Sequence, residues 1–334
     1  MPRTSKANGE IEVGRGAARP LLDRLLDVLA SSGISGADAL ALRRRAFARV
    51  HDIAGARGVP LFVRPQKTRP VSATGHCCAL DCAHCGGKFL RGMSTPSEAV
   101  AAASGEDAPK SWLLSGGCDG RGAVPLPPES VLRELARVGR INWHPGLAPP
   151  ETVERARGYV DCISFDFIGN DDTVSRVLGL NARVKDYLDT YRRLREIAPV
   201  VPHLVVGLDG SRIRGEYRAL DLLAAEGTES LVILVLWPAR GTAFENLSPP
   251  DLRDVFSVFA AARTKLPRAR LSLGCMRPPG AYRTAVDAMA AAVGFDMIVQ
   301  PAGPVVAEVA SSVAHFDECC AFAAIDDGWD TSCA

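Results

Sequence analysis

Short apolar runs that alternate with longer helix-like stretches dominate the chain from residue 70 onward. The runs lie at residues 71–74, 111–115, 140–143, 160–166, 201–207, 230–236, 270–274 and 296–300. Continuous apolar runs of this length are typical of strands buried on both faces of a parallel sheet. Eight strand-helix units predict an α/β fold, a closed (β/α)8 barrel of the TIM type. The first and third runs are short, so a six-stranded open barrel stays an alternative.

The two ends of the chain follow other patterns. Residues 1–19 mix charges with glycine and predict a disordered tail, whereas residues 20–69 contain two amphipathic stretches that predict a helical extension. The barrel is expected over residues 70–305. The remaining residues, 306–334, are expected to form a tail that carries three cysteines.

Composition narrows the choice of partners and compartment. The 334 residues are 47% hydrophobic and carry a formal net charge of +1, which favours neither nucleic acid nor a membrane surface as partner. The N-terminus lacks the apolar stretch of a signal peptide, and no run approaches the roughly 18 apolar residues of a membrane span. We therefore expect a cytoplasmic protein, in which ten cysteines are metal ligands, catalytic groups or buried residues rather than disulfides.

The segment GHCCALDCAHCGGKF, residues 75–89, directly follows the first predicted strand. It contains Cys78, Cys82 and Cys85 at Cys-x3-Cys-x2-Cys spacing, with small neighbours that let a loop wrap closely around a cluster. Three thiolates leave one iron of a 4Fe-4S cluster open for another ligand. The alternative is a zinc loop with Cys77 or His84 as fourth ligand, but zinc sites usually pair Cys-x2-Cys with a second distant pair.

This motif, after the first strand of a βα barrel, resembles that of the radical S-adenosylmethionine (SAM) enzymes. The resemblance extends over about residues 70–305. It implies a 4Fe-4S cluster on Cys78, Cys82 and Cys85 and SAM bound to the open iron. His84 stands where the family usually has an aromatic residue near the adenine.

Two further elements resemble the family's SAM-binding segments. Ser115, Gly116 and Gly117 end the second predicted strand and resemble the Gly-Gly-Glu element, whose backbone meets the methionyl amino group of SAM. Cys118 replaces the glutamate.

After the fifth predicted strand, GLDGSRIRGEYRAL resembles the adenine-binding element. Ile213 would contact the adenine, with Gly215 and Glu216 as supports. The alternative is an ordinary strand-to-helix turn with Glu216 in the first turn of the helix.

The segment LWPARGTAFENLSP resembles the Pro-x-x-Gly-Thr element of the biotin synthase branch, and the eight-strand count agrees with that branch. Three polar residues at strand ends are candidate catalytic groups: Asp166, His144 and His203. Each is equally well explained as a satisfied polar group inside the barrel.

Spare cysteines predict a second Fe-S cluster. Sulfur-inserting members of the family sacrifice such a cluster as their sulfur source, and in biotin synthase an arginine helps to hold it. The candidates here are Cys118, Cys275, Arg277, Cys319 and Cys320. The alternative is that these cysteines are buried or incidental.

The resemblance implies reductive cleavage of SAM to a 5′-deoxyadenosyl radical, which abstracts hydrogen from an unactivated carbon. Sulfur insertion of the lipoyl or biotin synthase type would follow, most similar to the two-component lipoyl synthases. Implied partners are an electron donor of the flavodoxin or ferredoxin type, an acyl-carrying carrier protein and a second radical SAM protein.

Two other functions stay open. One is a carbon-skeleton isomerase of the methylornithine synthase type without sulfur transfer. The other is a non-catalytic Fe-S scaffold or redox sensor, which would not need glycine-rich strand ends.

Overall fold

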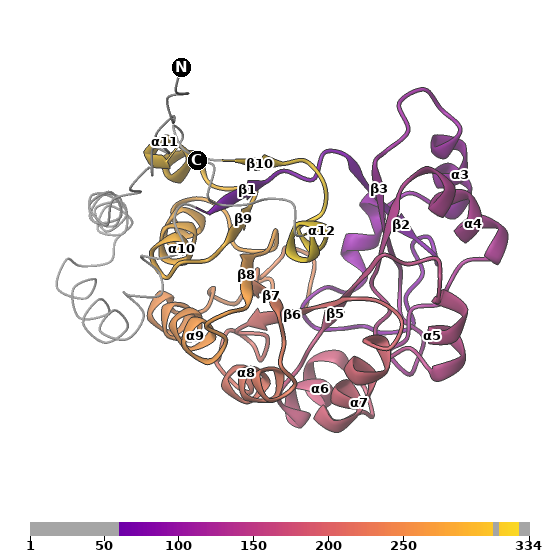
Figure 1. The fold of residues 1–334 in the computed structure, drawn as a ribbon. Coiled ribbons are helices and arrows are strands. Elements are labelled where there is room, and N and C mark those ends of the chain that lie inside the picture. The colour runs from indigo at the N-terminus through magenta and orange to yellow at the C-terminus, as the bar shows by residue number, and fades with distance from the viewer. Residues whose placement is uncertain (1–59, 310–313, 327–334) are drawn as a thin grey trace, which may run out of the picture.

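The computed structural model describes residues 60–309 and 314–326 (Figure 1). The tail predicted for residues 1–19 and the two helices predicted between residues 20 and 54 lie outside the described residues, as does Cys333. They stay predictions. Residues 61–63, which we assigned to the helical extension, form a strand instead.

Ten parallel strands form one sheet that curls into a TIM-like barrel (Figure 1). The strands are β1 (Leu61–Val63), β2 (Thr68–Ser72), β3 (Ser111–Ser115), β4 (Arg140–Trp143), β5 (Cys162–Asp166), β6 (Val200–Val206), β7 (Ser230–Val235), β8 (Arg270–Leu273), β9 (Met297–Val299) and β10 (His315–Phe316). All eight predicted runs are strands, β2 to β9, and they pair in chain order. The predicted α/β barrel is confirmed, with β1 and β10 added beyond β9.

Among the described residues, the two edge strands of the sheet do not pair with each other. This corrects the prediction of a closed eight-stranded barrel. The strand order is β10-β1-β9-β8-β7-β6-β5-β4-β3-β2, so β10 and β2 are the edges. Parallel neighbours need a crossover of a dozen or more residues, whereas only residues 64–67 separate β1 from β2. The edges meet through the loop after β10: the backbone N–H of Lys67 donates to the carbonyl of Asp317 at 2.8 Å, and that of Cys319 donates to Thr68 Oγ1 at 2.7 Å.

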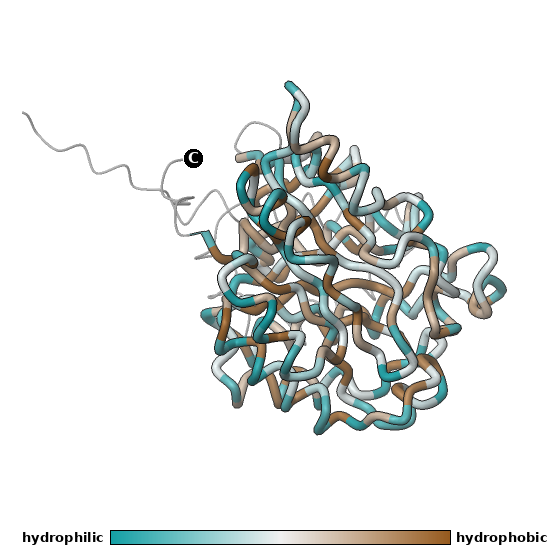
Figure 2. The backbone as a smooth tube through the Cα atoms, turned by 90° about the vertical axis from the view of Figure 1, so that its right-hand side faces the viewer, coloured by the Kyte–Doolittle hydropathy of each residue, from teal (hydrophilic) through white to brown (hydrophobic). Residues whose placement is uncertain are grey.

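Helices follow most strands and cover the outside of the sheet (Figure 1). They are η1 (Lys88–Gly92, a 3-10 helix), α3 (Pro96–Ala103), α4 (Glu129–Val138), α5 (Pro150–Ala156), α6 (Asp171–Leu178), α7 (Val184–Leu194), α8 (Glu216–Ala225), α9 (Leu252–Lys265), α10 (Ala281–Ala292), α11 (Gly303–Val309) and α12 (Cys320–Ile325). Capping residues fix some helix ends. At the start of α3, for example, the side chain of Thr95 accepts from the backbone N–H of Glu98, and the side chain of Glu98 accepts from the backbone N–H of Thr95. In Figure 2 hydrophilic and hydrophobic stretches alternate along the tube, as expected for helices with one buried face. Among the described residues, none of the helices has the length and apolar character needed to cross a bilayer.

The C-terminal segment enters the barrel rather than covering its mouth. α12 contacts β5, β6, β7 and β8 and packs against the side chains that these strands turn inward near their N-terminal ends. Phe322 is fully buried there, with the Arg140 guanidinium 4.3 Å from its ring centre. Arg140 also pairs with Glu318 and Asp326, each at 2.7 Å. α12 therefore fills the N-terminal part of the interior and leaves the C-terminal part open.

Phe322→Ala should lower the free energy of unfolding by about 3–5 kcal/mol, because truncation of a buried phenylalanine leaves a cavity. Urea denaturation measures the change. Phe89→Ala is the matched control, since Phe89 is 44% exposed, and should cost less than about 1 kcal/mol. Equal losses in the two variants would show that α12 does not stabilise the barrel.

Candidate active site

The cysteine loop after β2 is held against the C-terminal end of β3 by backbone contacts. Ala79 N donates to Cys118 O at 2.8 Å, and Gly117 N donates to Thr74 Oγ1 at 2.7 Å. A Cβ at position 117 would lie 2.0 Å from Cys77 O and 2.6 Å from Cys78 Cα. Only glycine permits this approach, because real side chains do not fit at such distances.

The structure therefore gives Gly117 a role in holding the loop, beside the contact with SAM that the sequence suggested. Its N–H is already engaged by Thr74, a residue that the sequence analysis did not select. The signal for it was weak, since a lone threonine after a strand is common.

The three motif cysteines line one cavity. Cys82 and Cys85 share a thiol hydrogen bond, which, together with His84, lowers the pKa of Cys85 against the opposing effect of burial. The same bond and burial raise the pKa of Cys82. Cys85 is therefore the member of the pair that more readily becomes a thiolate, the form that binds iron.

No three His, Cys, Asp or Glu side chains of the described residues converge on a single metal ion. A 4Fe-4S cluster does not require that convergence, because each of its thiolates binds a different iron. The three thiols of the loop are the donor type that such a cluster takes.

The cavity lies at the C-terminal ends of the strands and has a volume of about 310 Å³. Its walls are largely apolar, with Leu80, Phe89, Met93, Phe167 and Leu204 among them. Most of the residues selected from the sequence line it: Cys78, Cys82, His84, Cys85, Ser115, Gly116, Gly117, Cys118, His144, Asp166, His203, Gly215 and Glu216. Ile213 instead packs against the hydrophobic core, so its contact with adenine stays a prediction.

Glu216 begins α8 and is only 3% exposed. One carboxylate oxygen, Oε1, accepts from Gly207 N at 2.7 Å, whereas Oε2 has no hydrogen-bond partner. Burial raises the pKa of this carboxyl. His84 Nδ1 is likewise buried without a partner. Both residues line the cavity, and these two atoms are the unsatisfied polar side-chain atoms of its described wall.

His144, Asp166 and His203 form a polar group on neighbouring strand ends. His144 Nε2 lies 3.2 Å from Asp166 Oδ2, and the two imidazole rings stack with centroids 5.8 Å apart. Burial opposes charge on both His144 and Asp166, but their attraction prevails: the pKa of His144 is raised, and that of Asp166 is lowered to about 2. Burial and the charge of His144 lower the pKa of His203 to about 4. At neutral pH His203 is therefore neutral.

The structure separates the residues predicted to hold a second cluster into two groups. Cys118 lies beside the first loop, where burial and the nearby Cys78 raise the pKa of its thiol to about 12. Cys275, Cys319 and Cys320 interact electrostatically with one another beside α12. The Cys319 thiol accepts from Asn142 Nδ2 at 3.3 Å, and its hydrogen bond with Cys320 lowers its pKa to about 7.

Arg277 is 1% exposed and bonded within the protein. Its guanidinium pairs with Asp287 at 2.5 Å and donates to the carbonyls of Gly274 and Val299. In this conformation it does not reach toward a cluster, which corrects its assignment as a cluster ligand. The sequence did not show that α10 supplies a buried aspartate as its partner.

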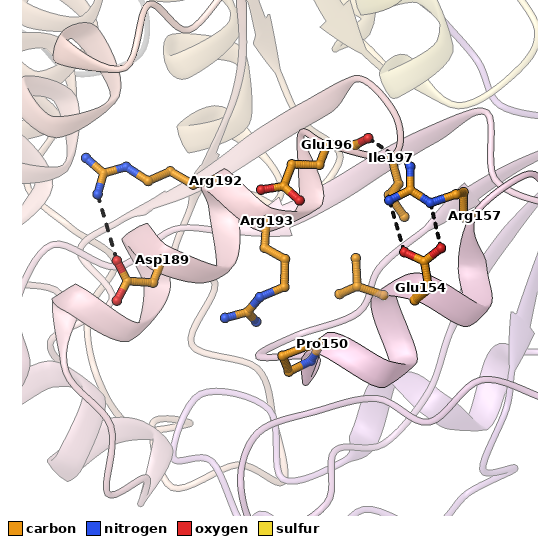
Figure 3. Close-up of a pocket in the computed structure, with 9 residues that line it drawn as sticks. Pro150, Glu154, Arg157, Asp189, Arg192, Arg193, Glu196 and Ile197 are labelled. Atoms are coloured by element: carbon orange, nitrogen blue, oxygen red, sulfur yellow. Dashed lines mark hydrogen bonds and ion pairs between the residues drawn. The ribbon is translucent and has the colours of Figure 1, made fainter.

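A second hollow lies outside the barrel between α5 and α7 (Figure 3). Its charged side chains largely pair with each other: Arg157 with Glu154 at 2.9 Å, and Arg192 with Asp189 at 3.8 Å. Its paired surface charges indicate no chemistry.

Comparison with known proteins identifies relatives by fold. No family model matches the chain, and no curated protein matches it in sequence. Among solved structures, methylornithine synthase (PylB) is similar with a TM-score of 0.53 and 15% identity, covering 84% of this chain and 85% of that one. HydG, a maturase of the [FeFe]-hydrogenase, has a TM-score of 0.58 and 14% identity, covering 87% and 73%. HydG from Carboxydothermus hydrogenoformans has a TM-score of 0.55 and 16% identity, covering 85% and 70%. The chain shares the fold of these proteins.

Gly117→Ala should displace the cysteine loop and abolish most of the iron that the chain takes up on anaerobic reconstitution, because the new Cβ collides with the backbone of Cys77 and Cys78. Gly120→Ala is the matched control, since no atom lies within 4 Å of a Cβ there. Iron per chain measures both. Full iron content in Gly117→Ala would contradict the tight approach.

Asp166→Asn should lower the free energy of unfolding more at about pH 6 than at about pH 8.5. The raised pKa of His144 means that its stabilising charge is fully present below the unfolded value of about 6.5 and is lost as pH rises through the folded value. Asp166 itself is ionised at both pH values, since its pKa is about 2. Urea denaturation at the two pH values tests this, with the exposed Asp172→Asn as control; an equal loss at both would argue against the ion pair.

Proposed function

We propose that this protein is a radical SAM enzyme that abstracts a hydrogen atom from an unactivated carbon. One observation carries the proposal: a three-cysteine loop, held by Gly117 against the end of β3, opens into an apolar cavity with unpartnered polar atoms. The shared fold with methylornithine synthase and HydG supports it. A scaffold or redox sensor would need the thiols but not the cavity.

The residues fit the two cofactors. Cys78, Cys82 and Cys85 would hold a 4Fe-4S cluster, and Glu216 and His84, which line the same cavity, would contact polar atoms of SAM. When bound and reduced, the pair supplies one-electron cleavage of SAM and removal of a substrate hydrogen. The apolar walls exclude water, which protects a radical from quenching.

His203 would accept a proton and His144 would donate one at the base of the cavity. In neutral His203, Nδ1–H donates to Val201 O at 3.0 Å, which leaves Nε2 as an acceptor. The attraction of Asp166 outweighs burial and raises the pKa of His144, which favours the charged ring that can donate. One donor and one acceptor side by side suit a substrate with a polar group near its reacting carbon.

For the step after hydrogen removal we propose sulfur insertion, supported by the neighbouring thiols of Cys275, Cys319 and Cys320. A carrier protein with an acyl chain and a second radical SAM protein would be its partners. Skeletal rearrangement is the second candidate, because methylornithine synthase shares the fold over 85% of its length and Arg277 is bonded internally. Either reaction needs a one-electron donor of the flavodoxin or ferredoxin type.

Anaerobic reconstitution of the wild type and of a Cys78→Ala/Cys82→Ala/Cys85→Ala variant tests the proposal. The wild type should bind at least about four irons and, when reduced, convert SAM to 5′-deoxyadenosine; the variant should lose about four irons and the SAM cleavage. Cys162→Ala, which removes a buried core thiol, is the control and should retain both. A wild type without iron or without SAM cleavage would contradict the proposal.

The number of irons per chain also distinguishes sulfur insertion from skeletal rearrangement. Sulfur insertion predicts about eight irons in the wild type and about four in the triple variant, whereas rearrangement predicts about four and none.

A further inference from the structure

A buried carboxylate at the rim of the cavity gathers three arginines. Asp209 is 3% exposed and lies in the loop between β6 and α8. Its oxygens lie 3.0 Å from Arg176 Nη2, 3.1 Å from Arg212 Nη2 and 3.4 Å from Arg214 Nε. The three guanidiniums belong to α6 and to the loop before α8, and the sequence analysis selected none of them.

The cluster around Asp209 carries more positive than negative charge. Three guanidiniums around one carboxylate leave two positive charges, and the arginine side chains remain 47–59% exposed. Each guanidinium has five N–H donors, and the contacts with Asp209 use only a few of them. Like charges this close repel each other, so a second anion would lower the energy of the cluster.

The loop that carries the cluster has a defined shape. Ser211 has φ 71°, a conformation that is costly for a residue other than glycine, and its hydroxyl donates to Ser248 O at 2.5 Å. Glu216 Oε1 fastens the start of the loop at Gly207 N. These bonds fix the backbone of the loop from which Arg212 and Arg214 extend.

One arginine of the cluster, Arg214, reaches the cavity. Arg214 lines the cavity wall together with its neighbours Gly215 and Glu216, whereas much of the remaining wall is apolar. From this juxtaposition we propose that Arg176, Arg212 and Arg214 form a subsite for the anionic head of the substrate, a carboxylate or phosphate, with the apolar body of the substrate inside the cavity. The inference rests on the proposed function in that it names the substrate class of the same site.

Binding of three six-carbon probes to the reconstituted full chain tests the subsite: hexanoate, hexyl phosphate and hexanol, each measured by isothermal titration calorimetry. Both anions should bind at least about tenfold tighter than hexanol, with an affinity that falls as salt rises. The tighter of the two anions identifies the head group. Equal affinity for hexanol and both anions would overturn the proposal.

Two variants assign the effect to the arginines. Arg176→Gln/Arg212→Gln should weaken anion binding about tenfold or more and leave hexanol unchanged. If that variant does not fold, Arg176→Lys/Arg212→Lys decides, since lysine lacks the bidentate fork and should also bind the anions more weakly. Arg133→Gln/Arg137→Gln, on the exposed face of α4, is the matched control and should change nothing. Undiminished anion affinity in a folded Arg176/Arg212 variant would overturn the subsite.

Formation of 5′-deoxyadenosine, measured in the same wild-type preparation, tests the proposed reaction separately from the proposed anion subsite. SAM cleavage without anion preference would reject only the subsite. Anion preference without SAM cleavage would reject the proposed reaction and leave the subsite in place.

Discussion

The contact between Gly117 and the backbone of Cys77 and Cys78 is the constraint on which the site depends. It brings the end of β3 within a distance that no side chain tolerates, and the bonds from Ala79 to Cys118 and from Gly117 to Thr74 maintain it. The cysteine loop therefore takes its position from the sheet, not from its own short helix. Rigid elements place reacting groups more accurately than loops do, which a cluster that must meet both SAM and substrate requires.

Inside the barrel, side chains from neighbouring strands form successive levels from the N-terminal to the C-terminal ends of the strands. Inward-facing residues recur every second position, so β5 supplies Cys162, Ser164 and Asp166 to successive levels. Cys162 packs with α12, Ser164 Oγ accepts from Asn142 Nδ2 at 2.9 Å, and Asp166 pairs with His144. The lower level is apolar and filled, whereas the upper level is an open cavity whose largely apolar wall carries the polar group of His144, Asp166 and His203. This difference between the levels explains why charged groups are tolerated inside the barrel, because they face a cavity and not the packed core.

The sequence predicted the strands well because buried parallel strands are continuous apolar runs, and it predicted the cavity-lining residues because strand ends converge. It missed β1 and β10, which have three and two residues, and the inward path of α12, whose alanines and cysteines have no helical pattern. Arg277 was misassigned because its partner Asp287 lies on another element. The arginines around Asp209 were missed for the same reason: their meeting depends on loop geometry that no spacing reveals.

Electron paramagnetic resonance of the reduced, reconstituted chain, with and without SAM, tests the central claim most directly. A cluster held by Cys78, Cys82 and Cys85 has one iron without a protein ligand, so SAM should change its spectrum. We expect a 4Fe-4S signal that shifts when SAM is added. A signal that SAM leaves unchanged, or one that persists fully in the triple cysteine variant, would show that this loop does not hold an open cluster.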